Sequence, residues 1–416
     1  MGKPGWALRE VSTSTNCSGE PDGQIRIGTG AYRRANLALF CAGFVTFITL
    51  YDLQPLLPLF AREFGISPAA ASLPLSFSTV ALALGMLIAG TLSETVGRRA
   101  IMTTALFLTS ILALLTLFSH SFEYLLTLRL AQGIALAGVP SVAMAYLGEE
   151  MDAGSIGPAM GLYISGNALG GMSGRIGSAL LCEYVPWQNA IALVGVISLL
   201  LSLVFLKCLP PSTNFRQRRF RFGYLFTSLY PHLREPGLLC LYGLAFLTMG
   251  GFVSLYNYIG FRLLAAPYGM SQFQVSLIFL VYLLGSFSSG IVGSLIHRFG
   301  RPFMIRLALT VMLAGTLLTL AGSMVIIVAG VGIFTCGFFS AHAIASSWVG
   351  RRARTAKAQA SSLYLFCYYL GSSISGTAGG LFWMHYGWNG VAAMISLLII
   401  ASFGVALLLL RLPAVE

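Results

Sequence analysis

The chain has 416 residues, of which 56% are hydrophobic and only 9% are charged, and its formal net charge is +12. Soluble domains carry about 25% charged residues, so a chain of this composition cannot cover its own surface with polar groups. The composition therefore excludes a soluble globular protein and predicts an integral membrane protein that is solvated largely by lipid.

Long apolar runs follow one another along the chain. A helix needs roughly 20 apolar residues to cross a hydrocarbon core of about 30 Å, and twelve runs reach that length. Helices are expected rather than strands, because an open sheet edge cannot satisfy its backbone groups in lipid. The predicted spans are 36–60, 70–92, 100–119, 123–147, 158–181, 186–208, 237–260, 272–296, 303–322, 324–349, 359–383 and 388–410.

Residues 1–34 precede the first span and are polar and rich in Gly, Ser and Thr. They contain no apolar core of the kind that a cleavable signal peptide needs. We expect them to form a disordered cytoplasmic tail.

The basic residues show which side of the membrane each loop faces. If the N-terminus lies inside and twelve spans alternate, 21 of the 25 Lys and Arg residues fall in cytoplasmic segments, and only Arg62 and Arg262 fall in outer loops. This positive-inside distribution predicts that both termini are cytoplasmic. Because the charge is spread over the loops of one face, it does not indicate nucleic-acid binding.

The chain repeats itself at an interval near 200 residues. The segment "GTLSETVGRR" after the second span matches "GSLIHRFGRP" after the eighth at an offset of 203, and Trp187 matches Trp388 at an offset of 201. The predicted fold is therefore all-α: twelve transmembrane helices in two six-helix bundles, 35–208 and 236–416, joined by a cytoplasmic linker, 209–235. Two similar bundles with a site between them are typical of transporters, although such bundles can also form the scaffold of a channel or an enzyme.

The loop between the second and third spans contains a spaced motif. Its glycines allow a close helix approach and a tight turn, and its carboxylate can sit at a helix N-terminus of the other bundle. The motif resembles the G-x-L-x-D-x-x-G-R-[KR] signature of the major facilitator superfamily, with Glu94 in place of the Asp. The resemblance implies a cytoplasmic gate that latches near Gln359, although the arginines could equally serve only to anchor the topology. The motif residues are Gly90, Leu92, Glu94, Gly97, Arg98 and Arg99.

Other segments extend this resemblance. "RLAQGIALAG" matches the superfamily pattern R-x-x-Q-G at Arg129, and "GNALGG" resembles the antiporter signature G-P-x-x-G-G with Asn167 in place of the proline. In physical terms this stretch of small residues lets helix backbones approach each other. "YNYIGFRL", "GGMSGR", "SSLYLF" and "YGWNG" are similar to the acriflavine-sensitivity (YnfM-type) transporters of bacterial inner membranes. That resemblance covers nearly all of the chain after residue 34 and implies proton-linked efflux.

Asp52 is the one acidic residue that falls well inside a predicted span. A charge at a helix centre costs about 2.5–3.5 kcal/mol on insertion scales. At 1.5 Å per residue, Asp52 lies about 12 Å and Arg129 about 9 Å from the outer ends of their helices, so we expect them to pair across a wet cleft. A carboxylate that exchanges between Arg129 and a proton would couple transport to protons; the alternative is a static salt bridge that fixes helix packing.

Several other polar residues are candidates for the site. His342 could relay protons, because histidine titrates near neutral pH, or it could simply bond to a backbone carbonyl. Arg175 is expected to snorkel to the outer surface. The candidates for lining a substrate cavity are Gln54, Asn167, Tyr256, Asn257 and Tyr258.

The sequence thus predicts a proton-coupled exporter of a small organic solute or drug in a bacterial inner membrane, acting as a monomer among lipids. It contains no phosphate-binding G-x4-G-K-[ST] segment and no metal-ligand spacing, so the predicted energy source is the proton gradient and no cofactor, metal or catalytic residue is expected. The alternatives are a facilitative or proton-symport carrier for sugars or polyols and a non-transporting membrane sensor.

Overall fold

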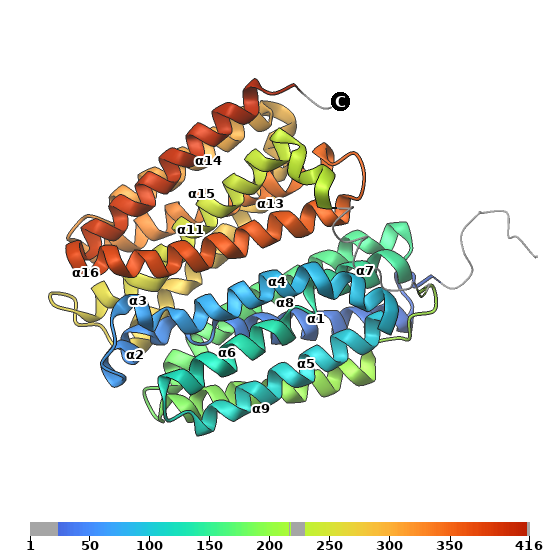
Figure 1. Cartoon of the computed structure of the whole chain (residues 1–416), viewed down its shortest axis with the longest axis horizontal. Coiled ribbons are helices and arrows are strands. Elements are labelled where there is room, and N and C mark those ends of the chain that lie inside the picture. Colours follow the sequence, from blue (N-terminus) through green and yellow to red (C-terminus); the bar gives the residue numbers. More distant parts are fainter. Residues whose placement is uncertain (1–23, 216, 218–228, 414–416) are drawn as a thin grey trace, which may run out of the picture.

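The computed structural model describes residues 24–215, 217 and 229–413, and these residues are almost entirely helical (Figure 1). Three short 3-10 turns are η1 (Gln54–Leu56), η2 (Thr116–Phe118) and η3 (Leu277–Val281). The helices are α1 (Gly30–Tyr51), α2 (Leu57–Glu63), α3 (Pro68–Ala71), α4 (Leu73–Val96), α5 (Arg98–Leu115), α6 (Phe122–Leu136), α7 (Pro140–Glu150), α8 (Ala153–Leu181), α9 (Trp187–Cys208), α11 (Pro236–Leu264), α12 (Gln272–Ser276), α13 (Tyr282–Phe299), α14 (Arg301–Leu318), α15 (Met324–Arg352) and α16 (Lys357–Arg411).

Ten helical stretches within the described residues are long and apolar enough to cross a membrane. The glycine-rich helix α8 has membrane length as well, although it is not among these ten. Helix α16 is really two helices, because Gly387 interrupts it with a backbone conformation that is not helical. Helix α8 and the second part of α16 bring the number of membrane-length segments to twelve, which is the predicted number.

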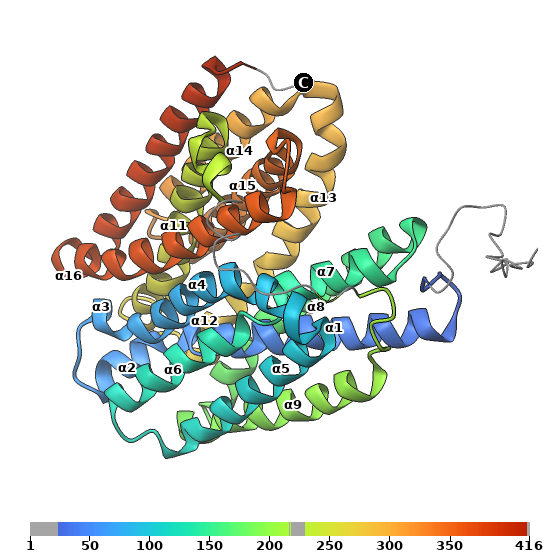
Figure 2. The ribbon, with the colours of Figure 1, turned by 45° about the vertical axis from the view of Figure 1, so that its right-hand side comes forward.

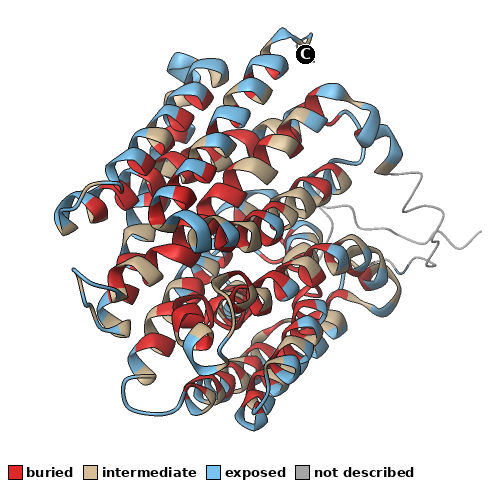
Figure 3. Cartoon of the chain, turned by 60° about the vertical axis from the view of Figure 1, so that its left-hand side comes forward, coloured by how far each residue is buried: buried red, intermediate tan, exposed pale blue. Residues whose placement is uncertain are grey.

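The helices form two bodies that lie side by side. In Figure 1, α1–α9 make up the lower body, and α11 and α13–α16 make up the upper body. We call residues up to α9 the N-terminal half and residues from α11 onward the C-terminal half. Buried residues are concentrated where helices face one another (Figure 3). Large apolar side chains cover much of the outside, for example Val325 (78% exposed) and Phe287 (72% exposed). An outer surface of this kind suits lipid rather than water.

Glycines let one pair of helices in each half approach to backbone contact. A Cβ atom on Gly170 of α8 would lie 2.3 Å from the carbonyl oxygen of Phe44 in α1. A Cβ atom on Gly371 of α16 would lie 2.1 Å from the carbonyl oxygen of Phe246 in α11. Each residue of the second contact follows its counterpart by about 200 positions, so the sequence repeat corresponds to a repeated packing contact.

The first predicted span is not one continuous helix. Helix α1 ends at Tyr51, Asp52 is its C-terminal cap, and η1 and α2 follow as separate helical segments. The physical reason is Pro55, since proline has no N–H to donate to the carbonyl of Tyr51 four residues earlier, so the α-helical hydrogen bonding ends there. The fourth span is divided between α6 and α7 in the same way, and Pro140 begins α7.

The predicted disordered tail is wrong for its last eleven residues. Ile25 is buried and forms a backbone bridge with Met151, and Thr29 caps α1, which begins at Gly30. A buried apolar residue, a capping threonine and backbone hydrogen bonds to Glu150 and Asp152 hold this stretch in place. Residues 1–23, and most of the predicted linker (216 and 218–228), lie outside the described residues.

The two halves meet at one end of the molecule. We call the "far end" the end that carries α2, α3 and residues 182–186, and the "linker end" the one where α7 and α15 finish. Hydrogen bonds join the halves near the far end, between Ser76 and Thr377 (2.8 Å) and between Thr79 and Ser373 (2.6 Å). Toward the linker end the halves diverge (Figure 2), and residues 354–358 at the start of α16 are exposed.

Candidate functional site

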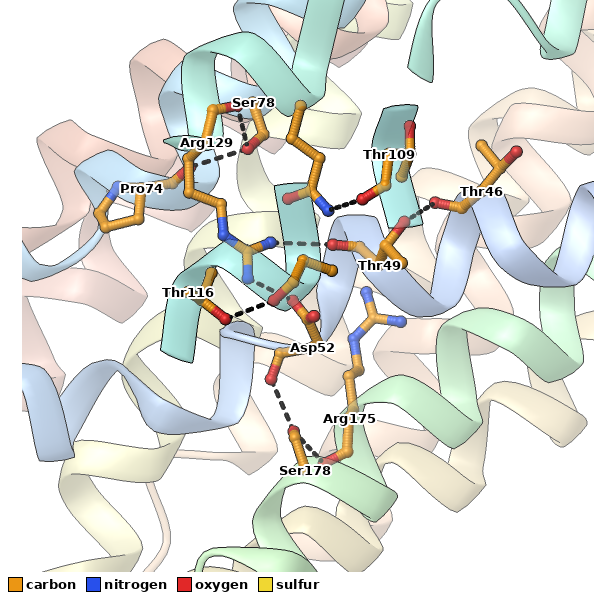
Figure 4. A network of polar contacts seen from close by, with 12 residues as sticks. Thr46, Thr49, Asp52, Pro74, Ser78, Thr109, Thr116, Arg129, Arg175 and Ser178 are labelled. Carbon is orange, nitrogen blue, oxygen red and sulfur yellow. Dashed lines mark hydrogen bonds and ion pairs between the residues drawn. The ribbon is translucent and has the colours of Figure 1, made fainter. Parts of the chain in front are cut away.

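A buried ion pair lies where α1 ends. Nη2 of Arg129, on α6, is 2.9 Å from Oδ1 of Asp52 (Figure 4). The exposed fractions of the two side chains are 1% and 0%. The predicted pairing is therefore confirmed, but the expected wet cleft around it is wrong, because packed helices enclose both groups.

The neighbouring helices fix the position of the arginine. Nη1 of Arg129 donates to the carbonyl oxygen of Thr49 at 2.8 Å, a group in the last turn of α1 that has no partner within the helix. Ser78 of α4 donates to the carbonyl oxygen of Arg129 at 2.9 Å. Gly133 allows this approach, since a Cβ atom there would lie 2.3 Å from the carbonyl oxygen of Ser78. The R-x-x-Q-G pattern thus holds α6 against α4 and directs its arginine toward α1.

The pair leaves some of its own hydrogen-bonding capacity unused. Oδ2 of Asp52 is buried and has no hydrogen-bond partner, and the same is true of Nε of Arg129. A carboxylate oxygen without a donor in a dry environment is unfavourable, because water would have solvated it.

Arg175 forms the second centre of the site and is not among the predicted site residues. Its side chain is only 3% exposed, so the expected snorkelling is wrong. The guanidinium donates from Nε to Oε1 of Gln54 at 2.6 Å and from Nη1 to the carbonyl oxygen of Gly171 at 2.8 Å. In Figure 4, Arg129 and Arg175 approach α1 from different helices on either side of Asp52. The available signal was that Arg129 and Arg175 are the two basic residues within spans.

Gln54 connects this centre to the other half of the molecule. Its Nε2 donates to Oδ1 of Asn257 in α11 at 2.9 Å. Tyr256, the preceding residue, packs its ring against Tyr282, whose ring also faces Arg175. Three of the five predicted cavity residues are thus brought together around Arg175.

The other two predicted cavity residues lie elsewhere. The hydroxyl of Tyr258 donates to the carbonyl oxygen of Gly376 at 2.6 Å, so this side chain packs α11 against α16. Asn167 lies against α1, because a Cβ atom on Gly43 would lie 2.3 Å from its Oδ1. Tyr258 and Asn167 therefore pack helices against each other, because their side chains fill gaps between closely packed helices.

His342 is separate from the ion pair and lies in α15 of the C-terminal half. Its Nδ1 is 3.0 Å from the hydroxyl of Tyr364 in α16, and the rings of Phe338 and Tyr368 lie beside it. The partner is therefore a side-chain hydroxyl rather than the backbone carbonyl that we considered. No bond given by the structure places His342 next to Asp52, and its role in proton transfer stays a prediction.

The predicted cytoplasmic gate makes its contacts within the N-terminal half. Arg98 forms a two-pronged ion pair with Glu149 of α7, with Nη2–Oε1 at 2.7 Å and Nε–Oε2 at 3.2 Å. Oε1 of Glu94 lies 3.9 Å from the same Nη2, and Arg99 donates to the carbonyl oxygen of Leu206 at 2.8 Å. The expected latch from Glu94 to the start of α16 is not formed, because the two halves diverge at this end.

The two glycines of this motif differ in what they do. Gly97 has a φ of +108° at the turn between α4 and α5, a conformation that side-chain-bearing residues rarely adopt. The expected tight turn is therefore present. A Cβ atom on Gly90 would meet nothing within 4 Å, so the expected close helix approach at Gly90 is absent from this conformation.

Comparison with known proteins decides the family. The model of the Major Facilitator Superfamily matches residues 37–266. The "Uncharacterized MFS-type transporter YybF" of Bacillus subtilis (strain 168) is 49% identical over 378 residues, which cover 91% of this chain and 94% of that protein. The chain belongs to the major facilitator superfamily. A second member, the "Inner membrane transport protein YnfM" of Escherichia coli (strain K12), is 46% identical over 92% of each chain.

A solved superfamily structure has the same fold. The "Crystal Structure of A Bacterial Homolog to Human Lysosomal Transporter, Spinster, in Inward-facing And Occupied Conformation" matches with a TM-score of 0.72 at 15% identity, covering 92% of this chain and 98% of that chain. The predicted facilitator fold and the predicted superfamily are thereby confirmed. The chain is a membrane transporter of this superfamily.

Proposed function

We propose that this transporter exports a small organic solute across a bacterial inner membrane in exchange for protons. The observation that carries the proposal is the buried pair of Asp52 and Arg129, in which Oδ2 of the aspartate has no partner. Ionisable groups within membrane spans are costly and usually mark ion pathways. The direction of transport rests on the likeness of "GNALGG" to antiporter sequences and on the resemblance to acriflavine-sensitivity transporters.

The position of Asp52 explains how a proton could affect the conformation. Asp52 is the C-terminal cap of α1, and its carbonyl oxygen accepts a hydrogen bond from Ser178 of α8 at 2.6 Å. Gln54, two residues later, holds Asn257 of the other half. Protonation would remove the charge that attracts Arg129 and weaken the ion pair. The carboxylate of Asp52 is therefore only two residues away from Gln54, whose contact with Asn257 joins the halves.

We further propose how the molecule is oriented in the membrane. The distribution of Lys and Arg assigns the linker end, and both termini, to the cytoplasm. Because the halves are joined at the far end and diverge at the linker end, the conformation described here is inward-facing. Alternating access then requires the far-end contacts to open as the linker end closes. The partners are protons, lipid and the solute, and a monomer is sufficient for this cycle.

The test measures proton exchange in inverted membrane vesicles. A solute library is first screened for compounds against which the chain protects the growth of an efflux-deficient host. Each protective compound is then added to vesicles that hold a respiratory pH gradient reported by acridine-orange fluorescence. We expect the wild type to dissipate the gradient when a protective compound is added, and we expect Asp52→Asn to lose at least nine-tenths of that signal at equal expression.

The matched control is Glu123→Gln, which removes a carboxylate from an exposed position at the start of α6. It should retain the wild-type response. Dissipation by Asp52→Asn at the wild-type rate would overturn the role of Asp52 and leave it as a static bridge. Transport that is indifferent to the pH gradient would show a facilitative carrier, and accumulation of sugars or polyols together with protons would show a symporter.

A further inference from the structure

Arg175 is a buried cation that has no anionic partner among the described residues. The ion pairs in the described ranges (24–215, 217 and 229–413) join other arginines to acids. The partners of Arg175 are the neutral side chain of Gln54 and the carbonyl oxygen of Gly171. Asp52, the nearby acid on α1, is held by Arg129. A guanidinium that is 97% withdrawn from solvent and not neutralised is costly, unless another charge reaches it at some stage of the cycle.

Aromatic rings from both halves surround this guanidinium. Its central carbon lies 3.9 Å from the ring centre of Tyr51 in α1, 4.8 Å from that of Tyr282 in α13 and 5.1 Å from that of Phe279 in η3. Cation–π contacts compensate part of the desolvation of the cation but not its charge. The rings also form flat apolar walls, which are the usual lining of small-molecule sites.

A second unused donor lies on the same chain of contacts. Asn257 accepts from Gln54 through Oδ1, while its Nδ2 is buried and has no hydrogen-bond partner. Gln54 therefore stands between two groups, Arg175 of the N-terminal half and Asn257 of the C-terminal half, that both offer N–H donors. Donors without acceptors, next to an uncompensated positive charge, are complementary to an anion.

We propose that Arg175, Gln54 and Asn257 form the recognition site for the carboxylate of an aromatic organic anion, whose ring packs among Tyr51, Phe279 and Tyr282. This proposal rests on the proposed transport function and names the class of its solute. A carboxylate accepts two parallel N–H bonds from a guanidinium, so it would replace Gln54 on Arg175. Release of Gln54 from Arg175 would in turn loosen its bridge to Asn257, so the anion would act on a contact between the halves.

The test compares charged and neutral probes of the same shape. The purified full-length transporter in detergent is titrated with benzoate, phenylacetate and salicylate, and in parallel with benzamide, phenylacetamide and salicylamide, while thermal unfolding is followed. We expect at least one carboxylate to raise the unfolding temperature in a saturable manner and its amide to have no comparable effect. We expect Arg175→Gln to weaken binding of that carboxylate at least tenfold.

Two further variants keep the result interpretable. Arg62→Gln removes an exposed arginine and should bind the carboxylate as the wild type does. If Arg175→Gln does not fold, Asn257→Asp serves instead, because it places a fixed carboxylate within the site and should compete with the probe. Equal effects of acids and amides, no saturable effect of any of the three acids, or wild-type binding by both Arg175→Gln and Asn257→Asp would overturn the proposal.

Binding in detergent needs no membrane and no pH gradient. Failure of proton coupling in vesicles therefore leaves this assay unaffected. Conversely, coupled export of uncharged compounds alone, with no carboxylate binding, would retain the proposed function and refute only this site.

Discussion

Asp52 and Arg129 are both buried away from solvent. Their opposite charges cancel, so the pair carries no net charge. The pair has one direct contact, at 2.9 Å, and its remaining polar atoms are poorly satisfied. Pairs of this kind contribute little net stability, but removal of one partner leaves a buried charge that costs about 3–5 kcal/mol. The two possible roles of the pair, proton exchange and helix packing, therefore differ in how single and double variants behave.

The first prediction concerns the arginine. Arg129→Leu leaves the carboxylate of Asp52 without a cation, so we expect its unfolding temperature in detergent to fall well below that of the wild type. Asp52→Asn/Arg129→Leu removes both charges and should recover a large part of the loss. A double variant that unfolds at or below the temperature of the single variant would show that the arginine acts through packing rather than charge.

At the residue scale, the sequence predicted a contact correctly where the depth of each residue in the membrane could be counted. Counting residues from the helix ends placed Asp52 and Arg129 at similar heights, and they are in contact. The same reasoning could not identify Arg175, because its partners are a carbonyl of its own helix and an amide and three rings from other segments. No acidic residue at a matching depth in the sequence pointed to Arg175. Only the tertiary fold shows that its side chain is enclosed.

Helices α1 and α8 are in backbone contact over several turns. Cβ atoms on Gly166 and Gly174 would also collide with α1, at 2.5 Å from the carbonyl oxygen of Phe40 and 2.4 Å from that of Ile48. Asp52 on α1 and Arg175 on α8 are therefore carried by one rigid pair of helices. We therefore expect both charged centres to move together when the halves move.

The second prediction tests this contact. Gly170→Ala places a methyl group against the carbonyl of Phe44, and overpacking of a close contact typically costs about 1–3 kcal/mol. We expect a lower unfolding temperature, and we expect Gly371→Ala to have a similar effect in the C-terminal half. The control is Gly177→Ala on the same helix, where a Cβ atom meets nothing within 4 Å. If Gly177→Ala were as damaging as Gly170→Ala, the loss would come from glycine itself and not from the contact.

Element boundaries were predicted well where apolar runs are uninterrupted and poorly where proline intervenes. Helix α9 begins one residue after the predicted start and ends at the predicted Cys208. Hydropathy alone extended the first span through Asp52 to Phe60, because it does not register that Pro55 and Pro58 begin new helical segments. The break matters for function, since it makes Asp52 a helix end and not a residue in the middle of a helix.

At the scale of the whole molecule, the internal repeat predicted the two halves but not their relative position. A sequence repeat predicts that the two halves have the same fold. It does not predict the angle between them, because that angle depends on contacts that form and break. The structure shows one such arrangement, joined by hydroxyl pairs between α4 and α16. This is why the predicted contact of Glu94 with the other half is absent while the predicted fold is present.

The third prediction exploits the joined end. In a background whose native cysteines are replaced, Ser76→Cys/Thr377→Cys should form a disulfide under oxidising conditions, because the two hydroxyl oxygens lie 2.8 Å apart. The disulfide would hold the far end closed, so we expect transport of a protective compound to stop and to return on reduction. Each single cysteine variant should transport under both conditions. Full transport by the oxidised double variant would mean that the far end need not open.

The internal repeat does not extend to the charges. About 202 positions beyond Asp52 and Arg129 stand Ser254 and Val331, so the ion pair is not repeated in the second half.

If this pair is the coupling element, each cycle carries one proton through it. For an uncharged solute a gradient of one pH unit then supplies about 1.4 kcal/mol, which sustains a concentration ratio of about tenfold, and a membrane potential of 100 mV adds about 2.3 kcal/mol. A carboxylate solute would leave with its own negative charge while a proton enters, so two charges would cross the potential in the favourable direction, and a single aspartate could maintain a much steeper gradient.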